Sequence, residues 1–283
     1  MMNDLSVMRT HKLFIGGAFP RSESGRTFEL KGPKGTFIAN IALASKKDAR
    51  EAVLSARSSF EKWSSATAYN RGQVLYRVAE IMQGRKNQFV EELVLLGTAK
   101  RDAEKEVQSA IDRWVWFAGW SDKLAMVNGS ANPVAGNFFN FSIPEPTGVV
   151  AIIPEAKPAL YSLVEAIAAA IVSGNTCVVL VPKNSSLVAI SLAESLATSD
   201  VPGGVVNILT CDIAEVAPHL ASHLDVNAID LSGVNSKDLA IDLEKAAAEN
   251  LKRILRPAKN QIEGLNRIKM WLETKTVWHP RGY

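Results

Sequence analysis

The sequence predicts an α/β fold built on a doubly wound, mostly parallel sheet. Short apolar segments predict the strands of this sheet, at 149–153, 177–181, 205–209, 228–231 and 253–255. Segments with helical spacing of apolar residues lie between them, at 159–172, 187–197, 214–222 and 237–250. Strands that alternate with longer helices indicate βαβ units, and uniformly apolar strands are typical of parallel sheets covered on both faces. Right-handed crossovers then place helices on both faces.

The first half of the chain predicts a small strand pair followed by helices. Residues 12–17 and 26–30 are expected to pair as strands. The helices are expected at 46–63, 67–82, 87–96 and 103–126. Ser45 and Thr67 are placed to cap the first two. The last helix carries neighbouring aromatic residues on more than one face, which predicts burial on several sides: Trp114, Trp116, Phe117 and Trp120.

A β-hairpin arm and a C-terminal strand complete the expected fold. Residues 137–143 alternate large and polar side chains, residues 144–146 predict a turn, and residues 148–153 begin another strand, which together indicate a two-stranded arm. Beyond Pro257 the pattern changes and predicts a helix over 261–272 and a last strand over 274–278.

The composition is that of an ordinary globular protein and excludes several classes of function. The 283 residues include 32 basic and 29 acidic side chains, and the net charge of +3 gives no electrostatic argument for nucleic acid or anionic membrane. Two cysteines and four scattered histidines predict no metal site. The most apolar stretch is interrupted at 173–175, so it does not predict a membrane helix. We expect a soluble, cytoplasmic protein with free thiols.

Several segments, in order along the chain, resemble the aldehyde dehydrogenase superfamily. They are 14–17 (FIGG), 52–63 (AVLSARSSFEKW), 117–124 (FAGWSDKL), 148–154 (GVVAIIP), 173–182 (SGNTCVVLVP), 201–209 (VPGGVVNIL) and 251–253 (LKR). The resemblance implies a coenzyme-binding-type domain over 1–135 and 147–258. It implies an oligomerisation arm and C-terminal tail over 136–146 and 259–283.

The resemblance also implies catalytic residues that this sequence lacks. Family enzymes attack an aldehyde with a cysteine thiolate, pass hydride to NAD(P), and hydrolyse the thioester with water activated by a glutamate. That cysteine lies beyond the coenzyme domain, whereas this chain has only Cys177, in an apolar strand, and Cys211, just after one. We interpret both as buried structural residues. No glutamate follows 251–253 at the family's position.

From these departures we predict no catalytic residue and no catalytic domain. The chain most resembles the degenerate second unit of family-16 type aldehyde dehydrogenases. The segment that carries the family's oxyanion asparagine reads 154–158 here and contains Glu155 and Lys157 instead. These two side chains can line a site, but a solvated pair in a loop is the simpler interpretation.

The coenzyme contacts implied by the resemblance are also degenerate. Val181 stands where the family has a lysine, so Lys183 is either a displaced substitute or points elsewhere. Ser232, Gly233 and Asn235 lie at a predicted helix N-terminus, with Ser236 beside them. They can receive an anion there, although an ordinary helix cap is the simpler explanation. The candidate cofactor residues are therefore Lys183, Ser232, Gly233 and Asn235, which would bind NAD(P) weakly or not at all.

The retained arms predict a protein partner. A strand whose edge has no partner in its own chain invites pairing with another chain. The aromatic helix around 114–120 should also expose apolar surface if the catalytic domain is absent. We expect a full-length aldehyde dehydrogenase paralogue, or a second copy of this chain, to bind through the 137–146 arm and the 274–278 strand.

Three hypotheses about function follow. The favoured one is a catalytically inactive subunit that scaffolds or stabilises an active aldehyde dehydrogenase. The second is an NAD(P)-dependent oxidoreductase acting on aldehydes through residues that do not align. The third is a regulator that binds coenzyme without turnover.

Overall fold

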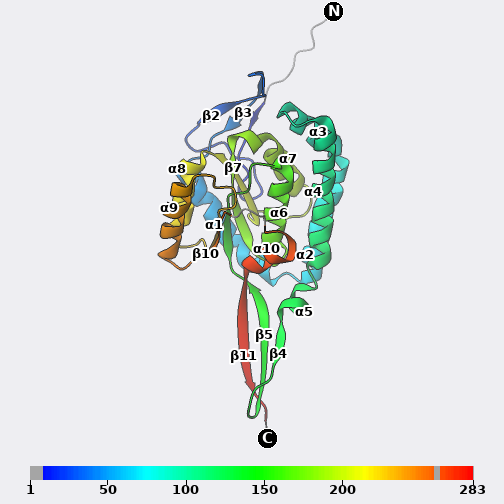
Figure 1. The fold of residues 1–283 in the computed structure, drawn as a ribbon, viewed down its shortest axis with the longest axis vertical. Coiled ribbons are helices and arrows are strands. Elements are labelled where there is room, and N and C mark those ends of the chain that lie inside the picture. The colour runs from blue at the N-terminus through cyan, green and yellow to red at the C-terminus, as the bar shows by residue number, and fades with distance from the viewer. Residues whose placement is uncertain (1–8, 258–261, 283) are drawn as a thin grey trace, which may run out of the picture.

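The computed structural model describes residues 9–257 and 262–282, and its centre is a five-stranded parallel sheet (Figure 1). The strand order is β10-β9-β6-β7-β8. The strands are β6 (Val149–Ile152), β7 (Thr176–Pro182), β8 (Val206–Cys211), β9 (Ala228–Asp230) and β10 (Arg253–Leu255). Every neighbouring pair is parallel, as the uniformly apolar segments predict. The predicted fold class is confirmed.

Helices cover both faces of this sheet, as the alternating pattern predicts. The crossover helices are α6 (Ala159–Ile171), α7 (Ser186–Ala197, after the short 3-10 helix η1, Lys183–Ser185), α8 (Ile213–Ala221) and α9 (Lys237–Ala248). The apolar residues of α6 and α7 form one core, and those of α8 and α9 form a second core on the opposite face. β6, β7, β8 and β9 therefore bury both of their faces, whereas β10, at the edge of the sheet, is partly exposed.

The N-terminal helices complete the two cores. They are α1 (Lys46–Ser65), α2 (Ala68–Gly84), α3 (Lys86–Leu95), α4 (Lys100–Trp120) and the short α5 (Leu124–Asn128). The predicted caps are confirmed: Ser45 forms a capping box with Asp48, and the Thr67 hydroxyl accepts a bond from the backbone of Asn70. α1 packs with α8 and α9, whereas α2, α3 and α4 pack with α6 and α7.

The predicted pairing of residues 12–17 with 26–30 is wrong. A small sheet in the order β1-β3-β2 is formed instead by β1 (Thr10–His11), β2 (Thr27–Lys31) and β3 (Phe37–Ala42). The 12–17 segment attaches to the edge of the central sheet, where the backbone of Phe14 exchanges hydrogen bonds with Ile208. Phe14 is 3% exposed there, so burial against β8 outweighs local pairing.

The arm is a three-stranded antiparallel sheet that projects from the rest of the molecule (Figure 1). Its order is β11-β5-β4, formed by β4 (Ser130–Asn132), β5 (Phe138–Pro146) and β11 (Leu272–Pro280). The predicted turn at 144–146 is wrong, because these residues continue β5. β4 pairs with β5 only as far as Ser142, so one side of β5 is open where its prolines lie, and proline is tolerated there.

Two further expectations about the arm need correction. Residues 149–152 belong to the parallel sheet, so they do not form the second strand of the arm. β5 also has a partner in its own chain, because it pairs with β11 along the full nine residues of each strand. Strands far apart in sequence supply each other's hydrogen bonds, a pairing that local patterns do not reveal. Among the residues that the structure describes, the outer edges of β11 and of the short β4 have no neighbouring strand.

The aromatic residues of α4 are covered, contrary to the prediction that they would be left uncovered. Trp114 and Phe117 are fully buried, and Trp116 and Trp120 pack partly buried against the same core. α2, α3 and α6 pack along α4, and Gly264 at the start of α10 (Gly264–Met270) lies against the Trp116 ring. The predicted helix start at Gln261 and the domain boundary at residues 258 and 259 lie outside the described residues. Within 9–257 and 262–282, no helix is long and apolar enough to cross a membrane.

Candidate functional site

The order of the parallel strands defines the place to look for a ligand. The chain enters the sheet at β6, moves outward to β7 and β8, and then returns to the other side of β6 to form β9 and β10. In open α/β sheets, ligands bind beyond the carboxyl ends of the strands where the strand order reverses. Here that point lies between β6 and β9, so the loops that follow them, at 153–158 and 231–236, are the candidate walls.

A pocket of about 480 Å³ lies at this end of the sheet. It is walled by the loops that follow β6, β7, β8 and β9, and its volume is within the range of small-molecule sites. Lys183, Gly233 and Asn235 line this pocket, so the structure brings three of the four candidate cofactor residues together. Ser232, the fourth, is not among the lining residues.

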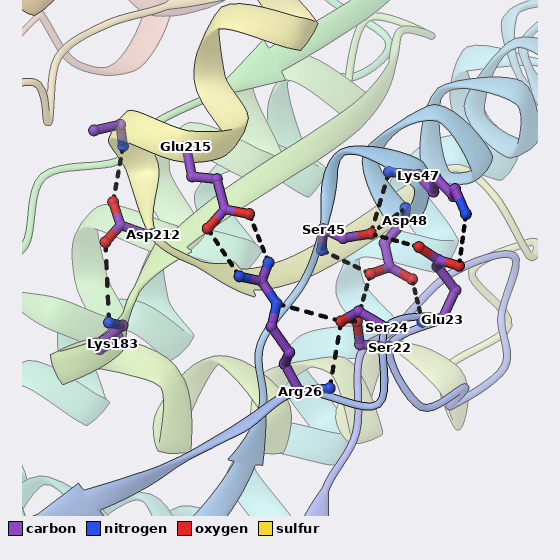
Figure 2. A network of polar contacts seen from close by, with 11 residues as sticks. Ser22, Glu23, Ser24, Arg26, Ser45, Lys47, Asp48, Lys183, Asp212 and Glu215 are labelled. Atoms are coloured by element: carbon purple, nitrogen blue, oxygen red, sulfur yellow. Dashed lines mark hydrogen bonds and ion pairs between the residues drawn. The ribbon is translucent and has the colours of Figure 1, made fainter.

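Lys183 lines the pocket, and Figure 2 shows its contact with Asp212. Its Nζ lies 4.0 Å from Oδ2 of Asp212, and its side chain is 46% exposed. Asp212 also caps α8, since its Oδ1 accepts a hydrogen bond from the backbone N–H of Ala214 at 3.1 Å. A single long ion pair leaves other N–H donors of the lysine ammonium for a ligand.

A second ion pair stands beside Lys183 in the same view. Both terminal nitrogens of Arg26 donate to the carboxylate of Glu215, at 3.2 and 2.6 Å (Figure 2). This bidentate pair joins the start of the small N-terminal sheet to α8. Arg26 is therefore already neutralised, which leaves Lys183 as the less firmly paired of the two cations near the pocket.

At Gly233 the loop that follows β9 contacts the loop that follows β6. A Cβ atom at this position would lie 2.0 Å from the carbonyl oxygen of Pro154, so no side chain fits. The Gly233 N–H donates to the carbonyl of Ile153 at 2.8 Å. The loops thus touch directly above β6 and β9, and the open space lies toward β7 and β8. Glycine is required here by close approach of backbone to backbone.

Ser232 belongs to a buried ion-pair network instead of the pocket. Its N–H donates to Oδ1 of Asp230 at 2.9 Å, and its hydroxyl accepts from Arg267 at 3.2 Å. Arg267, on α10, is 4% exposed and pairs with the fully buried Asp230 at the end of β9. The sequence contained a signal for this pair, because an aspartate at the end of an apolar strand needs a buried partner. It gave no indication that the partner is Arg267.

The N-terminus of α9 has the features of an ordinary helix cap. The Ser236 hydroxyl accepts from the N–H of Leu239 at 3.3 Å. The N–H groups of Gly233 and Val234 donate to backbone carbonyls of Ile153 and Leu231. Backbone donors that would cradle an anion at Gly233 and Val234 are therefore already used within the chain.

Neither cysteine can supply a thiolate in this structure. Cys177, in β7, is fully buried, and Cys211, at the end of β8, is 1% exposed although it borders the pocket. Burial raises the pKa of both thiols far above the usual range. A nucleophilic cysteine needs the opposite environment, a polar and partly open one that lowers the thiol pKa.

Glu106, which sequence reasoning did not single out, caps the helix that begins beside this site. One oxygen of its carboxylate accepts from the N–H of Leu160 at 2.6 Å and of Tyr161 at 3.3 Å. Burial raises the pKa of this carboxyl, and the two backbone bonds oppose the shift. Glu106 and Lys157 line a second pocket, of about 550 Å³, on the far side of the 154–158 loop. Within the described ranges, no cluster of His, Cys, Asp and Glu can hold a metal ion.

Comparisons with known proteins give a consistent result. A sequence model of the aldehyde dehydrogenase family matches residues 19–256. The human cytosolic 10-formyltetrahydrofolate dehydrogenase is 31% identical over 266 residues, which are 89% of this chain and 29% of that protein. The putative aldehyde dehydrogenase DhaS of Bacillus subtilis (strain 168) is 31% identical over 252 residues, which are 87% of this chain and 50% of that protein.

Solved structures agree in fold. A putative aldehyde dehydrogenase from Burkholderia cenocepacia superimposes with a TM-score of 0.82 at 30% identity, covering 86% of this chain and 50% of the other. PnpE in complex with nicotinamide adenine dinucleotide gives the same TM-score and coverage at 29% identity. This chain therefore spans half or less of the length of the relatives it matches.

Proposed function

The chain belongs to the aldehyde dehydrogenase family, and from this premise we propose that it is a non-catalytic subunit that scaffolds or stabilises an active aldehyde dehydrogenase. The observation that carries this proposal is the state of the cysteines. The 283 residues contain two, and both are buried in the sheet with pKa values raised by burial. Acyl transfer through a thioester requires an accessible thiolate, which neither position provides.

The path of the chain after β10 supports the same conclusion. Within a few residues of β10 the chain has begun α10, which packs against α6. Two buried polar contacts hold it there, the Arg267–Asp230 pair and a 2.7 Å bond from the N–H of Gly264 to Glu165. α10 thus packs back against the elements around the central sheet. The resemblance places the family's catalytic domain at this point.

The arm supplies the surface for a partner in this proposal. Phe138, Phe139 and Trp278 are 39%, 44% and 58% exposed on a sheet that projects from the body. Large exposed apolar side chains on a projecting sheet are typical of interaction sites. The outer edge of β11 offers unpaired backbone groups for β-augmentation by a full-length aldehyde dehydrogenase or by a second copy.

Co-expression with a full-length family member and size-exclusion chromatography with light scattering tests the proposal. We expect a stable complex that is weakened by Trp278→Ser and unaffected by Leu224→Ser, a matched loss of an exposed apolar residue after α8 (79% exposed). A monodisperse monomer that binds no family member would refute the scaffolding role. Cytoplasmic location is part of the same proposal, since both thiols are free and several relatives are named cytosolic.

One observation favours a second candidate function, a regulator that binds coenzyme without turnover. The pocket at the reversal of strand order contains Lys183, Gly233 and Asn235, and a structural relative is known in complex with nicotinamide adenine dinucleotide. Calorimetric titration with NAD+ and NADP+ tests it, with Lys183→Ala expected to weaken binding and Lys245→Ala, a 76% exposed lysine on α9, as the control. Binding without aldehyde oxidation separates the regulator from an oxidoreductase. No binding at millimolar coenzyme excludes both.

A further inference from the structure

A small pocket between α1 and α8 is lined mostly by lysine, arginine and histidine side chains. It has a volume of about 280 Å³ and lies between the first turn of α1 and the C-terminal end of α8. The basic or titratable residues around it are Lys46, Lys47, Arg50, His219 and His223, and no aspartate or glutamate lines it. It shares no lining residue with the pocket beyond β6 and β9.

Most of this positive charge is not neutralised by the residues that the structure describes. Lys47 pairs with Glu23 at 3.2 Å, as Figure 2 shows, and Glu215 on α8 is engaged by Arg26. Over the described ranges, neither Lys46 nor Arg50 has an ion-pair partner. Surface salt bridges are common and weak, so an ion pair at the surface says little about function. Unpaired cations gathered around one cavity indicate more, because together they attract an anion.

His223 faces the pocket with a defined hydrogen bond. Its Nδ1 accepts from the N–H of Asp225 at 3.1 Å, so in the neutral ring the proton is on Nε2, which can donate to a ligand. Burial lowers the pKa of this histidine, the carboxylate of Asp225 opposes the shift, and nearby cations add to it: Lys252, Arg50 and Arg57. A bound anion would relieve this concentration of positive charge.

Side chains, and not helix ends, create the site. Two N–H groups in the first turn of α1, those of Lys47 and Asp48, are already taken, because both donate to the Ser45 hydroxyl, and the Asp48 carboxylate in turn accepts from Ser45 and Ser22 (Figure 2). The positive end of the α1 dipole is opposed by the negative end of α8 across the pocket. That negative end accounts for His219 in the last turn of α8. It does not account for Lys46 or Arg50, which lie on α1.

We propose that this pocket binds a phosphate group, free or at the end of a small organic molecule. The lining offers an ammonium, a guanidinium able to bind two oxygens at once, and two imidazoles, which together suit a tetrahedral dianion. Ala49 and Leu220 supply an apolar wall that can receive a short organic group. The volume is close to the lower limit for ligand sites, which favours a small phosphate over a dinucleotide.

Calorimetric titration with inorganic phosphate and with phenyl phosphate, in a buffer free of other multivalent anions, tests this proposal. We expect saturable binding that K46Q/R50Q weakens by roughly 10-fold or more, because charge-assisted hydrogen bonds are lost. The matched control is K100Q/R101Q, which removes a lysine and an arginine from the exposed first turn of α4. This control should bind as the unaltered protein does.

The histidines provide an internal control that needs no variant. The chain has four histidines: His11, His219, His223 and His279. Proton NMR of the imidazole signals should show His219 and His223 shifting with added phosphate while the other two stay unchanged. Tighter binding of phenyl phosphate than of inorganic phosphate identifies a monoester as the ligand, and equal binding identifies the free anion. No saturable shift, equal shifts of all four signals, or equal weakening in the two double variants would overturn the proposal.

Discussion

The parallel sheet and the arm use the same kinds of residues in opposite ways. In β6, β7 and β8 nearly every side chain is buried on one face or the other, including both cysteines. In β5 and β11 large aromatic side chains are exposed, and the buried fraction is small. Polar groups buried in the sheet are therefore either protonated or paired with another group. The arm instead presents apolar side chains and unpaired backbone groups.

This contrast indicates which properties each region should control. Substitutions in the body, by which we mean the molecule without the arm, should alter the free energy of unfolding. Buried charges and close backbone contacts there cannot be changed without loss of stability. Changes in the arm should leave that free energy almost unaltered and act on association instead. The following predictions test this division, beginning with the largest effect.

The largest loss of stability should come from breaking the buried ion pair between α10 and β9. Arg267→Ala leaves the carboxylate of Asp230 buried without a partner, which costs about 3–5 kcal/mol in comparable cases. Urea unfolding followed by circular dichroism measures the loss. The double variant Asp230→Leu/Arg267→Leu removes both charges and should recover much of it. Equal stability of the two variants would mean that the pair is not what holds α10.

A smaller loss should follow from separating the two loops at the reversal of strand order. In Gly233→Ala the new methyl group meets the Pro154 carbonyl, a backbone atom that cannot move aside alone, and overpacking of this kind costs about 1–3 kcal/mol. Gly119, in α4, has open space where a Cβ atom would lie, so Gly119→Ala should stabilise by about 0.5–1 kcal/mol. Thermal unfolding of the two variants should therefore shift in opposite directions.

The same division explains what the sequence could and could not predict. The strands and crossover helices of the central sheet follow local periodicity. Their alternation along the chain and the fold class could therefore be predicted from the sequence. Lys183, Gly233 and Asn235 meet because carboxyl ends of neighbouring parallel strands lie at one edge, which the strand order alone implies. Ser232 joins Arg267 instead, because a buried carboxylate drew a partner from a distant helix. The β5–β11 pairing is likewise long-range and leaves no local pattern.

An arm variant should have almost no effect on the free energy of unfolding. Trp278 is 58% exposed and its ring contacts Phe138 edge-on with centroids 5.8 Å apart. Trp278→Ser should therefore change the free energy of unfolding by about 0.5 kcal/mol or less, as substitutions of exposed residues usually do. Part of the energy of one aromatic contact is lost in addition. Its effect should appear in light scattering at increasing protein concentration, as a loss of self- or partner-association. A large destabilisation would show that the arm is part of the folding unit.

The smallest effects should be opposite pH dependences in the two regions. Burial raises the pKa of Glu106 in the body, so the folded state holds its proton more tightly than the unfolded state does. The stabilisation is complete below the ordinary glutamate pKa and is lost as the pH rises through the folded value. On β11 of the arm, a hydrogen bond from Arg253 lowers the pKa of Glu273, so its contribution is present above the ordinary value and is lost as the pH falls through the folded one.

Urea unfolding from a pH below the ordinary glutamate pKa up to neutral pH separates these two dependences. Glu106→Gln should remove a decline in stability as the pH rises, because the neutral amide oxygen still accepts from Leu160. Glu273→Gln should remove a decline on the acidic side only, and a weak one, since this side chain is exposed and screened by solvent. If both variants altered the profile in the same direction, the two regions would not differ in how they hold their charges.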